Sequence, residues 1–276
     1  FHETPGCFGW GLGAPLGRCL EKPGVREKLR ALLEQAELAV VDDFRALSHV
    51  VRDRTMFNLT WEKARRDYLA NYRELKVYRR AAPIVVNGVI DEPDWKQAEA
   101  MPPFIRFMGS EPAELQTTVK VVYEPEALYF AIEALEPEPD RLKALADEPD
   151  SPRIWGDNEI EVFVSHPDQG GSYHHFALKH LGAFYDAFNQ VGDVHEKTAF
   201  ASGAELKTKV LQDRWVAELR IPTAPLGMAC SEGHVWKVNV ARSRRLTDDT
   251  REMSSAGAGQ FHNADNFVNL IFAGTP

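Results

Sequence analysis

The sequence predicts a mainly β protein, an antiparallel two-sheet β-sandwich preceded by an α-helical segment. Three observations lead to this fold class. From Pro23 to about residue 80, apolar residues recur every three or four positions, as they do on the buried side of helices. After Pro83 the apolar period changes to two, which is the period of strands. Short alternating segments with polar links then continue to the end of the chain, as is typical of a sandwich.

We place the domain boundary at this change of period. Residues 1–82 comprise an irregular lead-in, rich in Gly and Pro, and then the helical segment, whereas residues 83–276 form the sandwich. Thr60 is a favourable N-cap for a last helix that we expect to end near Arg80. Helices of this length bury their apolar stripes poorly by themselves, so we expect them to pack on a neighbouring domain.

Strands are predicted wherever alternation is clear. The dipeptide Asn87-Gly88 marks a turn after the first of them, and Pro125 lies in a hairpin between two well-alternating segments. The predicted strands cover residues 84–86, 117–123, 127–133, 159–164, 173–180, 183–188, 205–211, 215–221, 234–242 and 267–272.

The stretch from Arg153 to Gln190 contains the most informative of these strands. Read at period two, one side of the strand is apolar and carries Ile160, Val162 and Val164. The other side carries Glu159, Glu161 and Phe163, and Trp155 lies just upstream. An aromatic rim beside polar acceptors suits a sugar, whose ring has apolar C–H faces for stacking and hydroxyls for hydrogen bonds. The alternative interpretation is a half-exposed strand with an acidic outer face.

Composition limits the classes of partner. The net charge of -9 argues against nucleic acid, which would require a basic face. No apolar run approaches the roughly 18–20 residues of a membrane span. Cys7, Cys19 and Cys230 cannot all pair internally, and the first two either form a bridge in a secreted protein or are free thiols. The opening at Phe1 leads us to expect a piece of a longer chain.

Nine segments, in a fixed order, carry a family resemblance. They are Ile90–Trp95, Thr118–Tyr123, Leu128–Phe130, Trp155–Val164, Ala183–Ala187, Trp215–Pro222, Trp236–Arg244, Phe261–His262 and Asn266–Leu270. Over about residues 84–273 the chain resembles the family 9 carbohydrate-binding modules, which belong to the wider group of DOMON-like sandwiches. The upstream helical segment is similar to the helical tail of large glycoside hydrolases that carry such a module at the C-terminus.

This resemblance implies a site in which a terminal sugar lies between two tryptophans, with charged and amide side chains on its hydroxyls. By position, Trp155 matches one stacking tryptophan, and the loop matching the second offers Phe261 and His262. Lys179 or Tyr185 lies where a polar partner is expected. The full set of polar residues expected at the sugar is Glu161, Lys179, Tyr185, Arg242, Arg244 and Asn263.

The resemblance also implies structural calcium, and no organic cofactor is expected. Carboxylates in loops supply the hard oxygen ligands that calcium prefers, which makes Asp91, Asp94 and Asp157 the candidates. Haem, bound by some DOMON-like sandwiches, is permitted by the number of Met and His residues, but no axial pair is marked.

Three histidines in one predicted strand do not predict a shared zinc ion. His174 and His180 share a face but lie roughly 20 Å apart in an extended strand, and His175 points to the other face. A zinc site would require a further histidine, such as His195 or His234, to fold in.

We therefore predict a non-catalytic carbohydrate-binding module in an extracytoplasmic, secreted or periplasmic, polysaccharide-degrading protein. Its partners would be a mono- or oligosaccharide or the end of a polysaccharide, and a catalytic domain upstream in the same chain. The main alternative is a structural or interaction module that braces a catalytic domain and binds no sugar. A third is hydrolysis by Glu159 and Glu161, whose Cα atoms are about 6–7 Å apart on one face.

Overall fold

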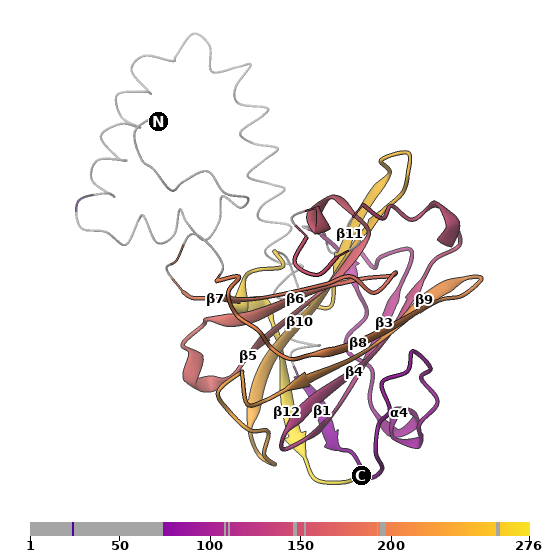
Figure 1. Ribbon diagram of the computed structural model, residues 1–276. Coiled ribbons are helices and arrows are strands. Elements are labelled where there is room, and N and C mark those ends of the chain that lie inside the picture. Colours follow the sequence, from indigo (N-terminus) through magenta and orange to yellow (C-terminus); the bar gives the residue numbers. More distant parts are fainter. Residues whose placement is uncertain are drawn as a thin grey trace. The chain divides into compact units, whose positions relative to one another are not determined.

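The computed structural model describes Gly24 and residues 74–276, apart from 108, 110, 146–147, 152, 192, 194–196 and 258–259. The chain divides into two units between Lys63 and Ala64, and the fold below is that of the described residues of the second unit, Ala64–Pro276 (coloured in Figure 1). The helices predicted upstream of residue 74, with Cys7 and Cys19, lie outside the described residues. Within the described part of the chain, no helix has the length and hydropathy that crossing a membrane requires.

Among the described residues, twelve strands form one hydrogen-bonded sheet, in which β7-β6-β5-β10-β12 and β3-β4-β9-β8 are joined through β1 (Figure 1). The strands are β1 (Glu74–Arg79), β2 (Ile105–Arg106), β3 (Thr117–Glu124), β4 (Ala127–Leu135), β5 (Glu159–Ser165), β6 (Tyr173–Lys179), β7 (Phe184–Asn189), β8 (Glu205–Val210), β9 (Arg214–Pro222), β10 (Val235–Arg245), β11 (Arg251–Ser255) and β12 (Val268–Ala273). The short helices are α4 (Pro93–Gln97), η1 (Pro139–Arg141), η2 (Ile154–Gly156), η3 (Pro167–Gln169) and η4 (Ala264–Asn266).

The two halves of this sheet share one hydrophobic core. Val162 of β5 and Val240 of β10 come from one half, Phe130 of β4 and Leu219 of β9 come from the other, and all four belong to a single buried cluster. Two β layers that bury their apolar faces against each other define a sandwich. The predicted mainly β sandwich is confirmed.

β1 corrects the predicted end of the helical segment. The residues Glu74–Arg79, which we expected to be helical, form a strand in which Leu75 and Val77 are buried and their neighbours Glu74 and Lys76 are exposed. This strand pairs in parallel with β12 and with β3, so the sheet is mixed and not purely antiparallel. The segment itself alternates at period two, but Leu75 also continues the three- and four-residue spacing of the residues upstream, which led to the helical prediction.

The segment 84–90 contains no strand, contrary to the prediction, although its turn is present. Gly88 has a φ of 83°, and the backbone N–H groups of Asn87 and Gly88 donate to the Glu218 carboxylate at 2.9 and 2.8 Å. The Glu218 side chain of β9 therefore satisfies backbone N–H groups that we expected to pair with a neighbouring strand.

β5 has the two faces that its alternation predicts. Ile160, Val162 and Val164 enter the core between the layers. On the opposite face, Phe163 belongs to a second buried cluster that includes Phe261 and Phe267. The C-terminal part of the chain thus packs on the outer face of β5, where the candidate site lies.

Candidate functional site

The strand register gathers polar and aromatic side chains on the outer face of β5, β6 and β7. Directly paired residues in neighbouring strands project to the same side of a sheet. Phe163 pairs with His175, and Glu161 pairs with Ala177, which in turn pairs with Tyr185. The residues on this face are Glu159, Glu161, Phe163, Tyr173, His175, Lys179 and Tyr185.

Trp155 lies in η2, at the edge of this face, and its residue surface is 40% exposed. Its indole stacks on the His175 ring with centroids 5.4 Å apart, and the Tyr185 ring meets it edge-on at 5.0 Å. The preceding Ile154 is buried in a cluster with Tyr185 and Ala187, which anchors η2 to the sheet. The predicted rim position of Trp155 therefore has a physical basis, because one turn buries its aliphatic residue and presents its indole to solvent.

A carboxylate and two imidazoles meet beside the indole. The Nε2 atom of His175 lies 3.0 Å from Oε2 of Glu161, and both residues are buried. The Nε2 atom of His262 lies 4.0 Å from the same oxygen, and its side chain is 52% exposed. The Tyr173 hydroxyl pairs with Nδ1 of His262 at 2.8 Å. No local pattern predicts this cluster, since His262 comes from a loop about a hundred residues after Glu161.

Asn239 of β10 positions the loop that carries His262. Its side-chain oxygen accepts the backbone N–H of Gly257 at 2.8 Å, and its side-chain nitrogen donates to the carbonyl of Phe261 at 3.2 Å. Phe261 is 5% exposed, so it anchors the loop in the aromatic cluster and cannot form the second stacking wall. Asn263 accepts the N–H of Asp265 and caps η4. His262 is thus held between two fixed points.

The second carboxylate on β5 differs from Glu161 in its surroundings. Burial, reinforced by the neighbouring Glu161 carboxylate, raises the pKa of Glu159 to about 9. Glu159 therefore keeps its proton at neutral pH and can act there as a hydrogen-bond donor.

Lys179 lies on the predicted face of the sheet, but its ammonium group is buried in an ion pair with Asp157. Its Nζ atom lies 2.5 Å from Oδ2 of Asp157 and 3.3 Å from the carbonyl of Ile154. The Asp157 carboxylate also accepts the backbone N–H of Leu145 at 2.7 Å. Lys179 and Asp157 are both buried, so the pair fixes η2 to β6 and does not face a ligand beside Trp155.

Arg242 and Arg244 share a face, as predicted, but it is not the face of Glu161. Arg242 pairs in register with Ile160, whose side chain enters the core, whereas Glu161 pairs with Ala241. The Arg242 guanidinium accordingly donates to the carbonyl of Leu135 in β4, at 2.8 Å. The expectation that these arginines join Trp155 at one sugar is therefore corrected by the register of β10.

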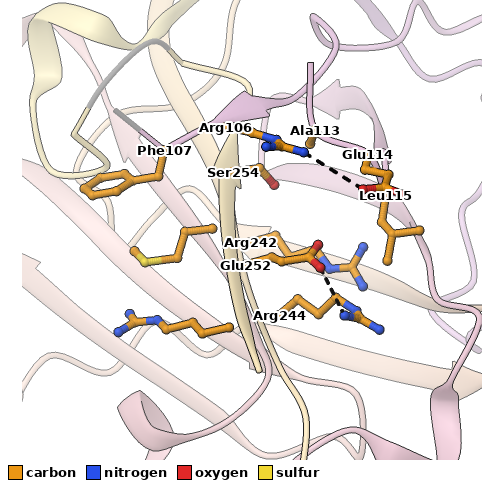
Figure 2. A pocket seen from close by; sticks show the side chains of 11 residues that line it. Arg106, Phe107, Ala113, Glu114, Leu115, Arg242, Arg244, Glu252 and Ser254 are labelled. Atoms are coloured by element: carbon orange, nitrogen blue, oxygen red, sulfur yellow. Dashed lines mark hydrogen bonds and ion pairs between the residues drawn. The ribbon is translucent and has the colours of Figure 1, made fainter. Parts of the chain in front are cut away.

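The two arginines enclose a buried carboxylate. Glu136 accepts from Arg242 at 3.1 Å and from Arg244 at 2.8 and 2.9 Å, and Arg244 also reaches Glu252 at 3.4 Å. They line a cavity of about 510 Å³ beside β11, with Arg106 and Glu114 at its mouth (Figure 2). Glu136 and Glu252 already neutralise the buried arginines that line the cavity. We therefore interpret these residues as a structural ion-pair network.

The three candidate calcium ligands do not meet at one point. Asp94 accepts the backbone N–H groups of Ala81 and Ala82, Asp157 is paired with Lys179, and Asp91 is exposed. Within the described residues, the one group of at least three potential metal-ligating side chains is Glu161, His175 and His262. The aspartates therefore do not fit a shared calcium ion in this arrangement, and calcium itself stays a prediction.

His174 and His180 are separate from His175, as expected. His174 packs between the Phe188 and Phe200 rings, whereas His180 meets the edge of Trp215. The expectation that these three histidines do not share an ion agrees with these positions.

The fold and this face define a β-sandwich with a cluster of aromatic and titratable side chains on the outside of one sheet. A family model described as "carbohydrate family 9 binding domain-like" matches residues 86–274. The chain belongs to this family, and the resemblance found in the sequence is confirmed.

Solved structures with the same fold are distant in sequence. A family 9 carbohydrate-binding module from Caldicellulosiruptor kristjanssonii, in complex with cellotriose, is 16% identical, with a TM-score of 0.52 over 73% of this chain and 95% of that one. A structure titled as the glucose complex of such a module from that organism is also 16% identical, with the same TM-score over 73% and 97% of the two chains. A protein from Bacteroides uniformis whose proposed role is carbohydrate binding is 17% identical, with a TM-score of 0.58 over 72% of this chain and 99% of that one. No curated protein matches the chain.

Proposed function

We propose that the sandwich binds carbohydrate without catalysis and that a terminal sugar ring stacks on Trp155. Family membership supports the class of ligand, as do the cellotriose and glucose in the titles of two structures with this fold. The observation that carries the proposal for this chain is the 40% exposure of Trp155 next to the buried Glu161 carboxylate.

The side chains around the indole match the two kinds of surface on a sugar. The exposed indole offers an apolar plane for the C–H face of a ring. Glu161 offers acceptors for hydroxyls, and His262 and Asn263, on the loop at the opposite edge, offer polar groups to the sugar rim. Tyr185 acts through Trp155, because its ring contacts the indole edge-on and fixes its orientation.

The proposed site has one tryptophan wall. Phe261 is buried, so the exposed residue at the second position is His262, whose imidazole gives a smaller stacking surface than an indole. We therefore expect an affinity in the micromolar to millimolar range, about -4 to -8 kcal/mol.

Isothermal titration calorimetry with glucose and cellotriose tests the proposal. Trp155→Ala should weaken binding by about 1–3 kcal/mol, by analogy with the range measured for nucleic-acid bases that stack on an aromatic side chain. Val210→Ala is the matched control, because Val210 is 38% exposed on β8, in the other half of the sheet, and its affinity should equal that of the wild type.

Two results would reject sugar binding at Trp155. The first is the absence of heat with every sugar tested, which would favour the alternative of a structural module that braces a catalytic domain. The second is an unchanged affinity in Trp155→Ala. Turnover of aryl glycosides by the wild type, lost in Glu161→Gln, would instead favour an enzyme.

The wider setting forms part of the same proposal. We place the chain in a secreted or periplasmic polysaccharide-degrading protein, with a catalytic domain upstream. Sequencing the gene on the 5′ side of the codon for Phe1 tests this placement, and a reading frame with no catalytic domain would reject it. The calcium prediction is tested by a melting temperature that rises with Ca²⁺ and falls again with a chelator.

A further inference from the structure

We propose that Glu161, His175 and His262 form a binding site for a divalent transition-metal ion of the zinc type. One ligand atom from each of the three lies within 4.8 Å of the other two. Two imidazoles and one carboxylate are the nitrogen and oxygen donors that zinc accepts in sites with an open coordination position.

The distances fit a single ion after a small adjustment. Around a tetrahedral zinc ion with bonds of about 2.0–2.1 Å, neighbouring ligand atoms lie about 3.3 Å apart. Oε2 of Glu161 lies 3.0 Å from Nε2 of His175 and 4.0 Å from Nε2 of His262. The ligand atoms of His175 and His262 lie within 4.8 Å of each other, so they must approach by at most about 1.5 Å, shared between two side chains, to reach ligand distance from one centre.

The groups around the two imidazoles orient them as metal ligands are oriented. Ligating histidines usually engage a partner through the ring nitrogen that does not bind the metal, and this partner fixes the ring. The Tyr173 hydroxyl holds Nδ1 of His262 at 2.8 Å, and Nε2 of the same ring lies 4.0 Å from Oε2 of Glu161. The His175 ring stacks on Phe163 at 4.4 Å and on Trp155 at 5.4 Å, so its plane is fixed as well.

Both imidazoles converge on one carboxylate oxygen. Nε2 of His175 lies 3.0 Å and Nε2 of His262 lies 4.0 Å from Oε2 of Glu161. A cation between these atoms would contact all three side chains. The side chains of Glu161 and His175 are shielded from solvent, whereas that of His262 is 52% exposed, so an ion can enter from the His262 side.

Titration of the full chain with Zn²⁺, after treatment with a chelator and in the absence of sugar, tests this site. We expect saturable binding of one ion that His262→Gln weakens at least about tenfold. Tyr173→Phe should also weaken it, by about tenfold, because loss of the group that orients a ligating histidine typically costs 10–100-fold. Co²⁺ in place of Zn²⁺ should give visible absorption bands that Zn²⁺ abolishes.

His234→Gln is the matched control, since His234 is a partly exposed histidine at the start of β10 and not in the cluster. Its Zn²⁺ affinity should equal that of the wild type. The proposal is overturned if no saturable binding occurs, if His262→Gln binds as tightly as the wild type, or if His234→Gln weakens binding equally. Far-ultraviolet circular dichroism verifies that each variant is folded. Sugar titrations run with a chelator present keep the failure of this proposal distinct from the failure of sugar binding.

Discussion

Gly257 offers the sharpest test of how the site is assembled. A Cβ atom at this position would lie 2.7 Å from the backbone oxygen of Asn266 and 2.8 Å from the side-chain oxygen of Asn239. Contacts under 3 Å require one partner to move, and here the partners are backbone and a side chain with two hydrogen bonds. Overpacking of this kind costs about 1–3 kcal/mol. Loss of the buried Asn239 hydrogen bond adds about 1 kcal/mol.

We therefore expect Gly257→Ala to lower the free energy of unfolding of the sandwich by about 2–4 kcal/mol. Urea denaturation followed by tryptophan fluorescence measures this change. Gly274→Ala is the matched control, because its nearest atoms, at 3.3 Å, belong to the end of the flexible Glu232 side chain, and it should stay within about 0.5 kcal/mol of the wild type.

The same substitution should also reduce binding at the site, because Gly257 and Phe261 are the two points through which Asn239 holds the His262 loop. An unfolding free energy within about 0.5 kcal/mol of the wild type would refute the steric argument. A stability loss of the expected size with unchanged ligand affinity would refute the link between this loop and the site.

Other buried polar groups lead to further expected outcomes, all measured by urea denaturation. Glu136→Gln should cost about 3–5 kcal/mol, because Arg242 and Arg244 would lose the carboxylate that they share in the interior. Lys179→Met should cost a similar amount, about 3–5 kcal/mol, since it leaves the buried Asp157 without its cation. Burial, with a smaller effect of Lys179, lowers the pKa of His180 to about 4. As the pH falls, His180 is therefore protonated at a higher pH in the unfolded chain than in the folded protein. Protonation of the unfolded chain destabilises the fold progressively as the pH falls from about 6.5 to 4. Between pH 7 and pH 4.5, His180→Gln should therefore lose about 2 kcal/mol less stability than the wild type.

Each of these outcomes has a result that contradicts it. For Glu136→Gln, a cost no larger than that of Glu133→Gln, which alters a partly exposed ion pair with Arg214, would show that the buried network adds nothing. For Lys179→Met, wild-type stability would mean that Asp157 is hydrated. For His180→Gln, a pH dependence of stability identical to that of the wild type would mean that folding does not lower the pKa of His180.

The outer face of β5 shows how far local pattern reaches. Alternation alone separates Ile160 and Val162 from Glu161 and Phe163, because side chains in a strand project to opposite sides whatever its partners are. The rim position of Trp155 was also predicted from its place just before this strand, but Asp157 in the same segment is buried, so nearness to the strand end does not by itself determine exposure. These features depend on a few neighbouring residues.

Features that depend on register or on distant segments were not predictable from local pattern. The sequence indicates that Arg242 and Arg244 share a face, but only the pairing of β10 with β5 shows that this face is opposite Glu161. The strand Glu74–Arg79 is defined by its pairing with β12. His262 joins Glu161 because Asn239 ties its loop down, and no spacing in the sequence encodes that contact.

The two proposals for this face use the same carboxylate, and this overlap can itself be measured. A metal ion on Glu161 and His262 would occupy the acceptor oxygens and the polar edge that a sugar on Trp155 requires. If both proposals hold, saturating Zn²⁺ should weaken the binding of glucose at least about tenfold in the wild type, and a chelator should restore it. In His262→Gln the Zn²⁺ concentration needed to weaken sugar binding should rise at least about tenfold, because the ion has lost a ligand. Equal sugar affinity with and without bound Zn²⁺ would mean that the sugar and the ion do not share Glu161. This residue would then belong to only one of the two proposed sites.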